Sequence, residues 1–376
     1  MKLFLFVLGL SALAYAKDCV NESPTTVSGT HAPTEYCSGD LIFEDNFDDL
    51  DVQKWEHEIT LAGGGNWEFQ WYGTNRSNSF CEDGVLYIRP TLTADTIGEQ
   101  AMMSDLLSVH GGNPAEVCTN AQFWGCERQG SPSNILNPVR SARIRTSTSF
   151  NFKYGKAEVR AKLPVGDWLW PAIWFMPRYN KYGTWPSSGE IDLMESRGNK
   201  NLIHNGVNIG TEQVGQTLHF GPYWYLNGYD YASYVVNNGA GYDNDFHLYQ
   251  LEWTPEYIKF SIDNKETTTI RGPFWELGKF DERAPNTDNP WRTSKNLVAP
   301  FDQEFFLIMN LAVGGTNGYF PDDAQNPTGK PWNNQSPSAF TEFWNNRGSW
   351  LPTWDLDTDY SKRASLKVDY VKIWAL

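Results

Sequence analysis

The chain has 376 residues, and its 45 acidic and 30 basic side chains give a formal net charge of −15. This excess of negative charge repels phosphate backbones and anionic lipid surfaces, so we expect neither a nucleic-acid nor a membrane partner. Aromatic side chains are abundant, with 17 Trp, 18 Tyr and 21 Phe. Since aromatic rings combine an apolar face with a polar edge, this composition favours a neutral carbohydrate ligand over a polyanion.

The N-terminus has the pattern of a secretory leader. Lys2 precedes an apolar run over residues 3–14, and residues 14–16 form a small-x-small cleavage site. The pattern predicts a signal peptide over residues 1–16, a mature chain that begins at Lys17, and an extracellular location. The apolar run is too short to span a bilayer. Glycosylation sequons, which fit the same route, occur at Asn21, Asn75 and Asn334.

Five cysteines are present, and export permits disulfides. Cys118 and Cys126 would close a short loop, and Cys19 with Cys37 would tie down the N-terminal tail. Cys81 would then stay unpaired as a small hydrophobic residue in an apolar strand. Spacing alone leaves the connectivity open. The sequence contains no CxxC or HExxH motif, so zinc is not indicated and we expect catalysis to require no cofactor.

The elements, in chain order, begin with residues 17–40, which are rich in Ser, Thr, Pro and Gly and predict an irregular tail. From Leu41 onward the pattern is that of β-strands. Residues 156–163 and 257–262 alternate polar with apolar side chains, which predicts strands with one wet and one dry face.

Further along, residues 305–313 are almost wholly apolar and predict a strand buried on both sides. Residues 274–280 allow one or two helical turns, and residues 368–374 predict a closing strand. Many short strands, interrupted by 32 Gly and 21 Pro, predict an all-β fold built as a two-sheet sandwich. With no repeat and no linker, we expect one catalytic domain over residues 41–376, and a monomer. Two long loops, 94–138 and 314–350, have the length of functional loops, and we expect them to wall a cleft.

The most informative segment is the acidic strand within residues 185–196. Glu190 and Asp192 lie two residues apart, so on a strand they share one face. Glu195 breaks the alternation, and in a regular strand it would point into the core, where a lone carboxylate is costly. A β-bulge at Leu193-Met194 would return Glu195 to the face of the other two acids.

Three acids on one face repel one another, so their pKa values must separate. A retaining glycosidase uses such a separation: one ionised carboxylate attacks, and one protonated carboxyl about 5–5.5 Å away protonates the leaving group. Asp192 between them would hold a shared proton or hydrogen bond. A solvated acidic strand or a calcium site is the alternative. The aromatic flanks at residues 170–177 and 185–186 favour a sugar-cleaving cleft.

Residues 189–195, Gly-Glu-Ile-Asp-Leu-Met-Glu, resemble the bulged ExDxxE motif of glycoside hydrolase family 16. That form is typical of laminarinases, and some members that cleave sulfated algal galactans share it. Residues 154–164, 246–255 and 309–315 resemble other strands of the family. Residues 118–128 resemble its animal branch, which includes laminarinases and the β-1,3-glucan recognition proteins of invertebrate immunity.

The resemblance implies a β-jelly-roll sandwich with a substrate cleft on the concave sheet. It implies endo-acting cleavage of β-1,3-glucan with retention, with Glu190 as nucleophile, Asp192 as the assisting residue and Glu195 as general acid/base. It also implies several substrate-binding positions, although a lone His or a Trp such as Trp253 fits a structural role as well. These positions are Trp185, which would stack on sugar, His219, the hydrogen-bonding Arg160, Trp174, Trp253, Asn78 and Asn310. Many members bind a structural calcium, for which Asp369 is the candidate ligand.

Two other functions stay open: a non-catalytic β-1,3-glucan recognition protein of innate immunity, and a mainly transglycosylating relative. The chain before residue 41 is too short for the N-terminal glucan-binding domain of the recognition proteins. The catalytic acids, usually replaced in those non-enzymatic relatives, are all present. Both features favour an enzyme.

Overall fold

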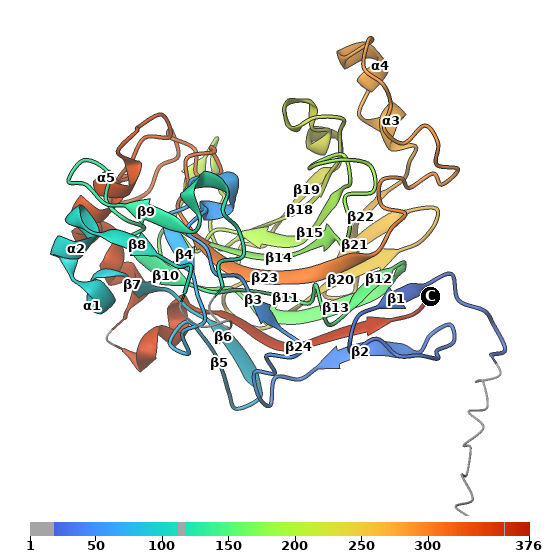
Figure 1. Ribbon diagram of the computed structural model, residues 1–376, viewed down its shortest axis with the longest axis horizontal. Coiled ribbons are helices and arrows are strands. Elements are labelled where there is room, and N and C mark those ends of the chain that lie inside the picture. Colours follow the sequence, from blue (N-terminus) through green and yellow to red (C-terminus); the bar gives the residue numbers. More distant parts are fainter. Residues whose placement is uncertain (1–18, 112–116, 357) are drawn as a thin grey trace, which may run out of the picture.

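The computed structural model describes residues 19–111, 117–356 and 358–376, so the predicted signal peptide over residues 1–16 lies outside the described part. In the described part, two large β-sheets pack face to face (Figure 1). None of its helices has the length and apolar character needed to cross a membrane.

The first sheet, sheet I, carries the acidic strand in its middle. Its strands in spatial order are β1 (Thr26–Ser28), β12 (Asn151–Lys153), β23 (Phe305–Val313), β14 (Leu169–Pro177), β15 (Glu190–Ser196), β18 (Gln213–His219) and β19 (Ser233–Asn237). Beside β23, the same sheet adds β11 (Arg143–Arg145), which pairs with β3 (Glu56–His57).

The second sheet, sheet II, covers the inner face of sheet I. Its strands in spatial order are β22 (Lys265–Ile270), β21 (Ile258–Ile262), β20 (His247–Trp253), β13 (Gly155–Lys162), β24 (Leu366–Trp374), β6 (Val85–Ile88) and β5 (Ser79–Glu82), with β2 (Leu41–Asp45) beside β24. A smaller sheet joins β4 (Gln70–Tyr72), β10 (Val139–Ser141) and β7 (Thr91–Leu92).

The core lies between the two sheets and follows the predicted alternation. In β13 the buried residues Ala157, Val159 and Ala161 point inward, and the polar residues between them point outward. They meet the inward residues of sheet I, such as Ile191 and Met309, in one hydrophobic cluster. The mostly antiparallel sandwich confirms the all-β prediction. The short helices α3 (Phe274–Leu277) and α4 (Phe280–Arg283) likewise confirm the predicted helical turns.

The N-terminal tail is more ordered than its composition predicts. Instead of being irregular throughout, it contains β1, whose Thr26 pairs with Lys153 at the edge of sheet I. The Leu376 N–H also donates to Thr25 Oγ1 at 2.9 Å, so the tail is joined to the C-terminus. The β-branched residues Thr26 and Val27 suit a strand, and the edge of β12 offers unpaired backbone groups.

The disulfides are Cys19–Cys37 and Cys118–Cys126, and Cys81 is free and half-buried in β5, as predicted.

The two long loops both fold beside the C-terminal end of β23 (Figure 1). The first contains α1 (Ala94–Ile97), α2 (Glu99–Ser104), β8 (Leu106–Ser108), η3 (Gln122–Trp124) and β9 (Glu127–Gln129). The second contains α5 (Ala339–Asn345) and α6 (Arg347–Trp350). The loops meet where the Ile135 N–H donates to Thr341 Oγ1 at 3.2 Å. Helices α3 and α4 stand on the opposite side of sheet I in Figure 1.

Candidate active site

A β-bulge brings the three acids onto one face of sheet I. On one side of β15, Ile173 lies opposite Met194 and Trp174 lies opposite Asp192, so Leu193 has no partner. On the other side the register also shifts between Asp192 and Glu195. Leu193 and Met194 are both fully buried. The predicted bulge is therefore confirmed, and Glu195 faces the same way as the other two acids.

Glu190 is held by two of the residues proposed from the sequence. The Trp185 indole N–H donates to Glu190 Oε2 at 2.6 Å, and His219 Nε2 lies 4.0 Å from Glu190 Oε1. The rings of Trp185 and His219 are 5.6 Å apart between centroids. Trp185 is 39% exposed. The indole therefore orients the carboxylate and still presents a face to a ligand.

Asp192 occupies the most enclosed position of the three. It is 2% exposed, and its Oδ2 lies 3.1 Å from His219 Nε2 without the alignment of a hydrogen bond. Burial, followed by the charges of Glu190 and Glu195, raises the pKa of Asp192 well above its usual range. A protonated Asp192 fits this position, because a neutral carboxyl needs no counter-charge and can share its proton with the neighbouring acids.

Glu195 is bound by a tryptophan that the sequence placed only among the aromatic flanks. The Trp170 indole N–H donates to Glu195 Oε1 at 3.0 Å, and the Trp170 ring stacks on Tyr319 with centroids 3.8 Å apart. Burial raises the pKa of Glu195, the charge of Glu190 adds to this, and the Trp170 hydrogen bond opposes it. A raised pKa is what a general acid needs near neutral pH.

His219 competes with Asp192 for a proton. Burial opposes a charged ring, whereas the charges of Glu190, Asp192 and Glu195 raise the pKa of His219, and a proton on Asp192 removes the charge that lies nearest to Nε2. The Asn227 amide nitrogen lies 2.8 Å from Nδ1 of the ring, and Asn227 Oδ1 accepts a hydrogen bond from the Tyr229 N–H. This orientation favours an unprotonated Nδ1 and places the ring hydrogen on Nε2, so we infer that the shared proton resides on Asp192.

Trp174 and Asn310 lie on the same face of sheet I as the acids. The Trp174 indole N–H donates to Asn310 Oδ1 at 2.7 Å, and Asn310 Nδ2 donates to the Tyr72 hydroxyl at 3.2 Å. Asn310 lies opposite Ala172, which in turn lies opposite Glu195. Because Asn310 is buried and hydrogen-bonded through both amide atoms, its position suits orienting Trp174 better than contacting sugar.

The structure does not bring Arg160 to the acids. Arg160 lies in β13 of sheet II and points to the outer surface, where its Nη1 is 2.5 Å from Asp369 Oδ2 and its guanidinium covers the Phe246 ring. The alternating pattern of β13 correctly predicted that one face of the strand is exposed to solvent. That wet face belongs to the sheet that does not carry the acids, so the assignment of Arg160 to the cleft is wrong.

Trp253 and Asn78 are structural. Trp253 is fully buried, packs against Phe152 and Phe305, and donates its indole N–H to the Phe301 carbonyl. Asn78 is 1% exposed and directs its amide nitrogen at the Arg89 carbonyl, with two further acceptors nearby. Neither side chain can reach a ligand in the cleft, so both substrate-binding predictions are wrong.

The contacts of Asp369 do not favour calcium there, because the Arg160 guanidinium already supplies the positive charge. In the described part of the chain, the one cluster of three or more His, Cys, Asp or Glu side chains with metal-ligand spacing is Glu190, Asp192 and His219. A protonated Asp192 makes this cluster a poor cation site. Structural calcium stays a prediction without an identified ligand.

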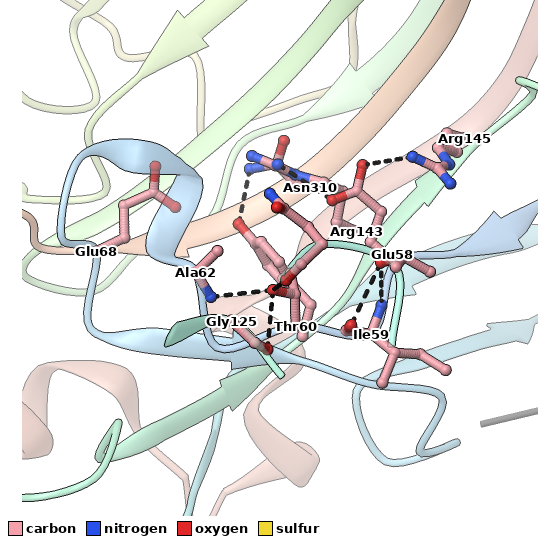
Figure 2. Close-up of polar contacts among 12 residues, drawn as sticks. Glu58, Ile59, Thr60, Ala62, Glu68, Gly125, Arg143, Arg145 and Asn310 are labelled. Atoms are coloured by element: carbon pink, nitrogen blue, oxygen red, sulfur yellow. Dashed lines mark hydrogen bonds and ion pairs between the residues drawn. The ribbon is translucent and has the colours of Figure 1, made fainter. Parts of the chain in front are cut away.

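A basic residue on the same face of sheet I is Arg143, which the sequence did not single out and which Figure 2 shows beside Glu58 and Asn310. It lies opposite Asn310 in β11, and its guanidinium stands 5.1 Å from the centre of the Trp174 ring. Arg143 Nη1 is 3.3 Å from Glu58 Oε2, and Glu58 Oε1 is 3.2 Å from Arg145 Nη1. Arg143, Ile144 and Arg145 alternate polar with apolar side chains as the residues around Arg160 do, but over a shorter stretch.

The chain is similar to proteins that bind or cleave β-1,3-glucan. A family model described as "Glycosyl hydrolases family 16" matches residues 129–285. The "Beta-1,3-glucan-binding protein" of Penaeus monodon is 49% identical over 342 residues, which cover 89% of this chain and 90% of that protein. "Glucan endo-1,3-beta-glucosidase A1" of Niallia circulans is 32% identical over 76% of this chain and 36% of that protein.

Among solved structures, the laminarinase from Rhodothermus marinus is similar with a TM-score of 0.53 and 27% identity, over 90% of this chain and 98% of that one. The shared architecture is the jelly-roll sandwich. The fold, the bulged acidic strand and the similarity over most of the length of a relative agree, and the chain belongs to glycosyl hydrolase family 16.

Proposed function

We propose that this protein is a retaining endo-1,3-β-glucanase, with Glu190 as nucleophile and Glu195 as general acid/base. One observation carries the proposal: the bulge in β15 puts both carboxyl groups on one face in different environments. Glu190 accepts a hydrogen bond from an exposed indole, whereas burial raises the pKa of Glu195. Two carboxyl groups with separated proton affinities are the requirement of a double displacement.

In the first step, Glu195 gives its proton to the glycosidic oxygen while Glu190 attacks the anomeric carbon. The C–O bond to the leaving sugar breaks, and a glycosyl–Glu190 ester forms. In the second step, ionised Glu195 takes a proton from water, the water oxygen attacks the anomeric carbon and the ester to Glu190 breaks. Protonated Asp192, beside His219 Nε2, limits the negative charge around Glu190.

A neutral glucan fits the site better than a sulfated galactan. On this face of sheet I, Arg143 is paired with Glu58, and Arg145 with Glu56 and Glu58. A sulfate group would find no free positive charge in this group of side chains. The similar proteins whose names refer to β-1,3-glucan support the same substrate class.

The alternative is a protein that binds β-1,3-glucan without cutting it; several relatives are named β-1,3-glucan-binding proteins. The retained acids, with their indole and histidine contacts, favour the enzyme.

The test is hydrolysis of laminarin by the purified protein, with NMR detection of the anomer released first. We expect new reducing ends in the β configuration. In Glu190→Gln, activity should fall by several orders of magnitude while laminarin binding and Tm are retained. A wild-type protein that binds laminarin and releases no reducing ends would establish the binding protein instead. Elongated products at high oligosaccharide concentration would establish the transglycosylating relative.

We also propose secretion and glycosylation, on the strength of the leader pattern in residues 1–16, the two disulfides and the sequons. Asn21 and Asn75 are the better acceptors because both residues are exposed, whereas Asn334 donates its amide to the Phe320 carbonyl. Mass spectrometry of the exported protein, before and after enzymatic deglycosylation, tests both.

A further inference from the structure

Three aromatic side chains form an exposed cluster away from the acids. Trp67, Phe123 and Trp124 are 39%, 42% and 66% exposed. The Trp67 ring centre lies 6.0 Å from that of Phe123 and 6.0 Å from that of Trp124. All three residues have positive φ, at 54°, 53° and 57°. This backbone region is costly for bulky residues, and such strain persists where the surrounding structure enforces it.

The surrounding structure does enforce it. Phe123 and Trp124 sit in the loop closed by the Cys118–Cys126 disulfide. Within this loop, the Gly125 carbonyl accepts hydrogen bonds from Leu61 N–H at 2.7 Å and from Thr60 Oγ1 at 3.1 Å; the Thr60 contact is drawn in Figure 2. The loop is therefore fixed to the segment that leads to Trp67. The fold keeps three large rings partly exposed to solvent at strained backbone positions, and this arrangement points to a ligand.

The cluster borders a cavity of about 560 Å³, a size typical of ligand sites, that contains none of the three acids. Its walls combine aromatic faces with neutral hydrogen-bonding groups. The lining residues are Trp67, Trp124, Arg128, Gln129, Asn134, Thr316, Ser336, Pro337, Ala339 and Phe340.

Arg128 is the charged residue of this lining. Its guanidinium donates to Asn137 Oδ1 and to the Phe123 carbonyl and lies over the Trp67 and Phe340 rings. Aromatic faces accept the apolar faces of sugar rings, and amide, hydroxyl and guanidinium groups bind the hydroxyls at their edges. The chemistry therefore suits a neutral sugar chain.

The cavity and the acids share one structural support. The Thr316 N–H donates to the Asn66 carbonyl at 2.9 Å, next to Trp67. Three residues further on, Tyr319 stacks on Trp170, whose indole N–H is bonded to Glu195. The short segment after β23 thus reaches from the cavity to the general acid/base candidate, and the cavity lies beyond the Glu195 side of the site.

We propose that the cavity bordered by Trp67 and Trp124 is a second glucan-binding site, which holds a distant part of a polymer whose cleavage point lies at Glu190 and Glu195. The ligand class rests on the proposed function. The site would favour long glucans over short oligosaccharides, because only a long chain reaches both places.

The experiment compares Trp124→Ala with the conservative Trp124→Phe, each in the wild-type and in the Glu190→Gln protein. Titration calorimetry of the Glu190→Gln proteins with laminarin measures binding without turnover. We expect Trp124→Ala to weaken laminarin binding about tenfold, the size typical of one lost stacking contact, and Trp124→Phe to retain most of it. In the active proteins, kcat/KM for laminarin should fall similarly with Trp124→Ala, and turnover of laminaritetraose should not.

Unchanged laminarin affinity in Trp124→Ala and in Trp67→Ala, with wild-type Tm, would overturn the second site. So would an equal loss on laminarin and laminaritetraose. The enzyme proposal fails separately: if the wild type releases no reducing ends but Trp124→Ala still weakens laminarin binding, the second site stands and hydrolysis does not. If Glu190→Gln binds no laminarin while the wild type cleaves it, hydrolysis stands and the second site fails.

Discussion

The hydrogen bond from Trp170 to Glu195 gives a direct test of the acid/base assignment. Trp170→Phe removes the indole N–H that lies 3.0 Å from Glu195 Oε1 and keeps an aromatic ring against Tyr319. The lost donor stabilises the ionised carboxylate, so its removal disfavours ionisation and raises the pKa of Glu195 further.

The size of the shift follows from the strength of the bond. A hydrogen bond to a charged group is worth about 1.5–3 kcal/mol. Glu195 is only partly buried by surface exposure, so we take the lower end, and at about 1.4 kcal/mol per pKa unit this corresponds to roughly one unit. The acid form of Glu195 is the one needed to cleave the glycosidic bond. The alkaline limb of kcat/KM against pH should therefore move up by about one pH unit.

Trp174→Phe is the matched control. It is the same substitution four residues along the same strand and on the same face, but it removes a hydrogen bond to the neutral Asn310. Its kcat/KM profile should keep the wild-type alkaline limb even where the absolute rate falls. An alkaline limb in Trp170→Phe that stays in place, moves down, or moves equally in both variants would refute Glu195 as the titrating acid.

Three further predictions concern neighbouring side chains. Trp185→Ala removes a stacking face worth about 1 kcal/mol and the hydrogen bond to Glu190, so kcat/KM on laminarin should fall at least about tenfold with little change in Tm; equal kcat/KM in a folded variant would exclude a substrate role. Asn227→Asp replaces the amide donor at Nδ1 of His219 with an acceptor and should raise the pKa of the ring. The 15N chemical shifts of the imidazole should then show a doubly protonated ring at neutral pH. A ring that is still protonated only at Nε2 would contradict the role given to the Asn227 amide. Trp253→Ala empties a fully buried position and should lower the free energy of unfolding by about 3–5 kcal/mol, with KM unchanged in the folded fraction; a raised KM at wild-type stability would return Trp253 to the cleft.

The sequence by itself determined the features that depend on neighbouring residues along one strand. Whether a side chain faces in or out is a local property of an extended backbone, so Glu190, Asp192 and the need for a bulge before Glu195 could be predicted from spacing and from the cost of a buried charge. The contacts of Trp185 and His219 with the acids agree with what the family resemblance implied.

Only the tertiary structure decided which of the solvent-exposed strand faces lies on the same side as the acids. Arg143 and Arg160 lie in strands with the same alternation, but β11 joins the sheet of the acids and β13 joins the opposite sheet. The environment of Trp253 was also undetermined, because an indole suits a core as well as a sugar. Likewise, Trp67 and Trp124 meet only because a disulfide-closed loop folds back onto a distant segment. Periodicity reports the exposure of a residue, whereas its partners depend on strand order and loop closure, which are set by contacts between residues far apart in the chain.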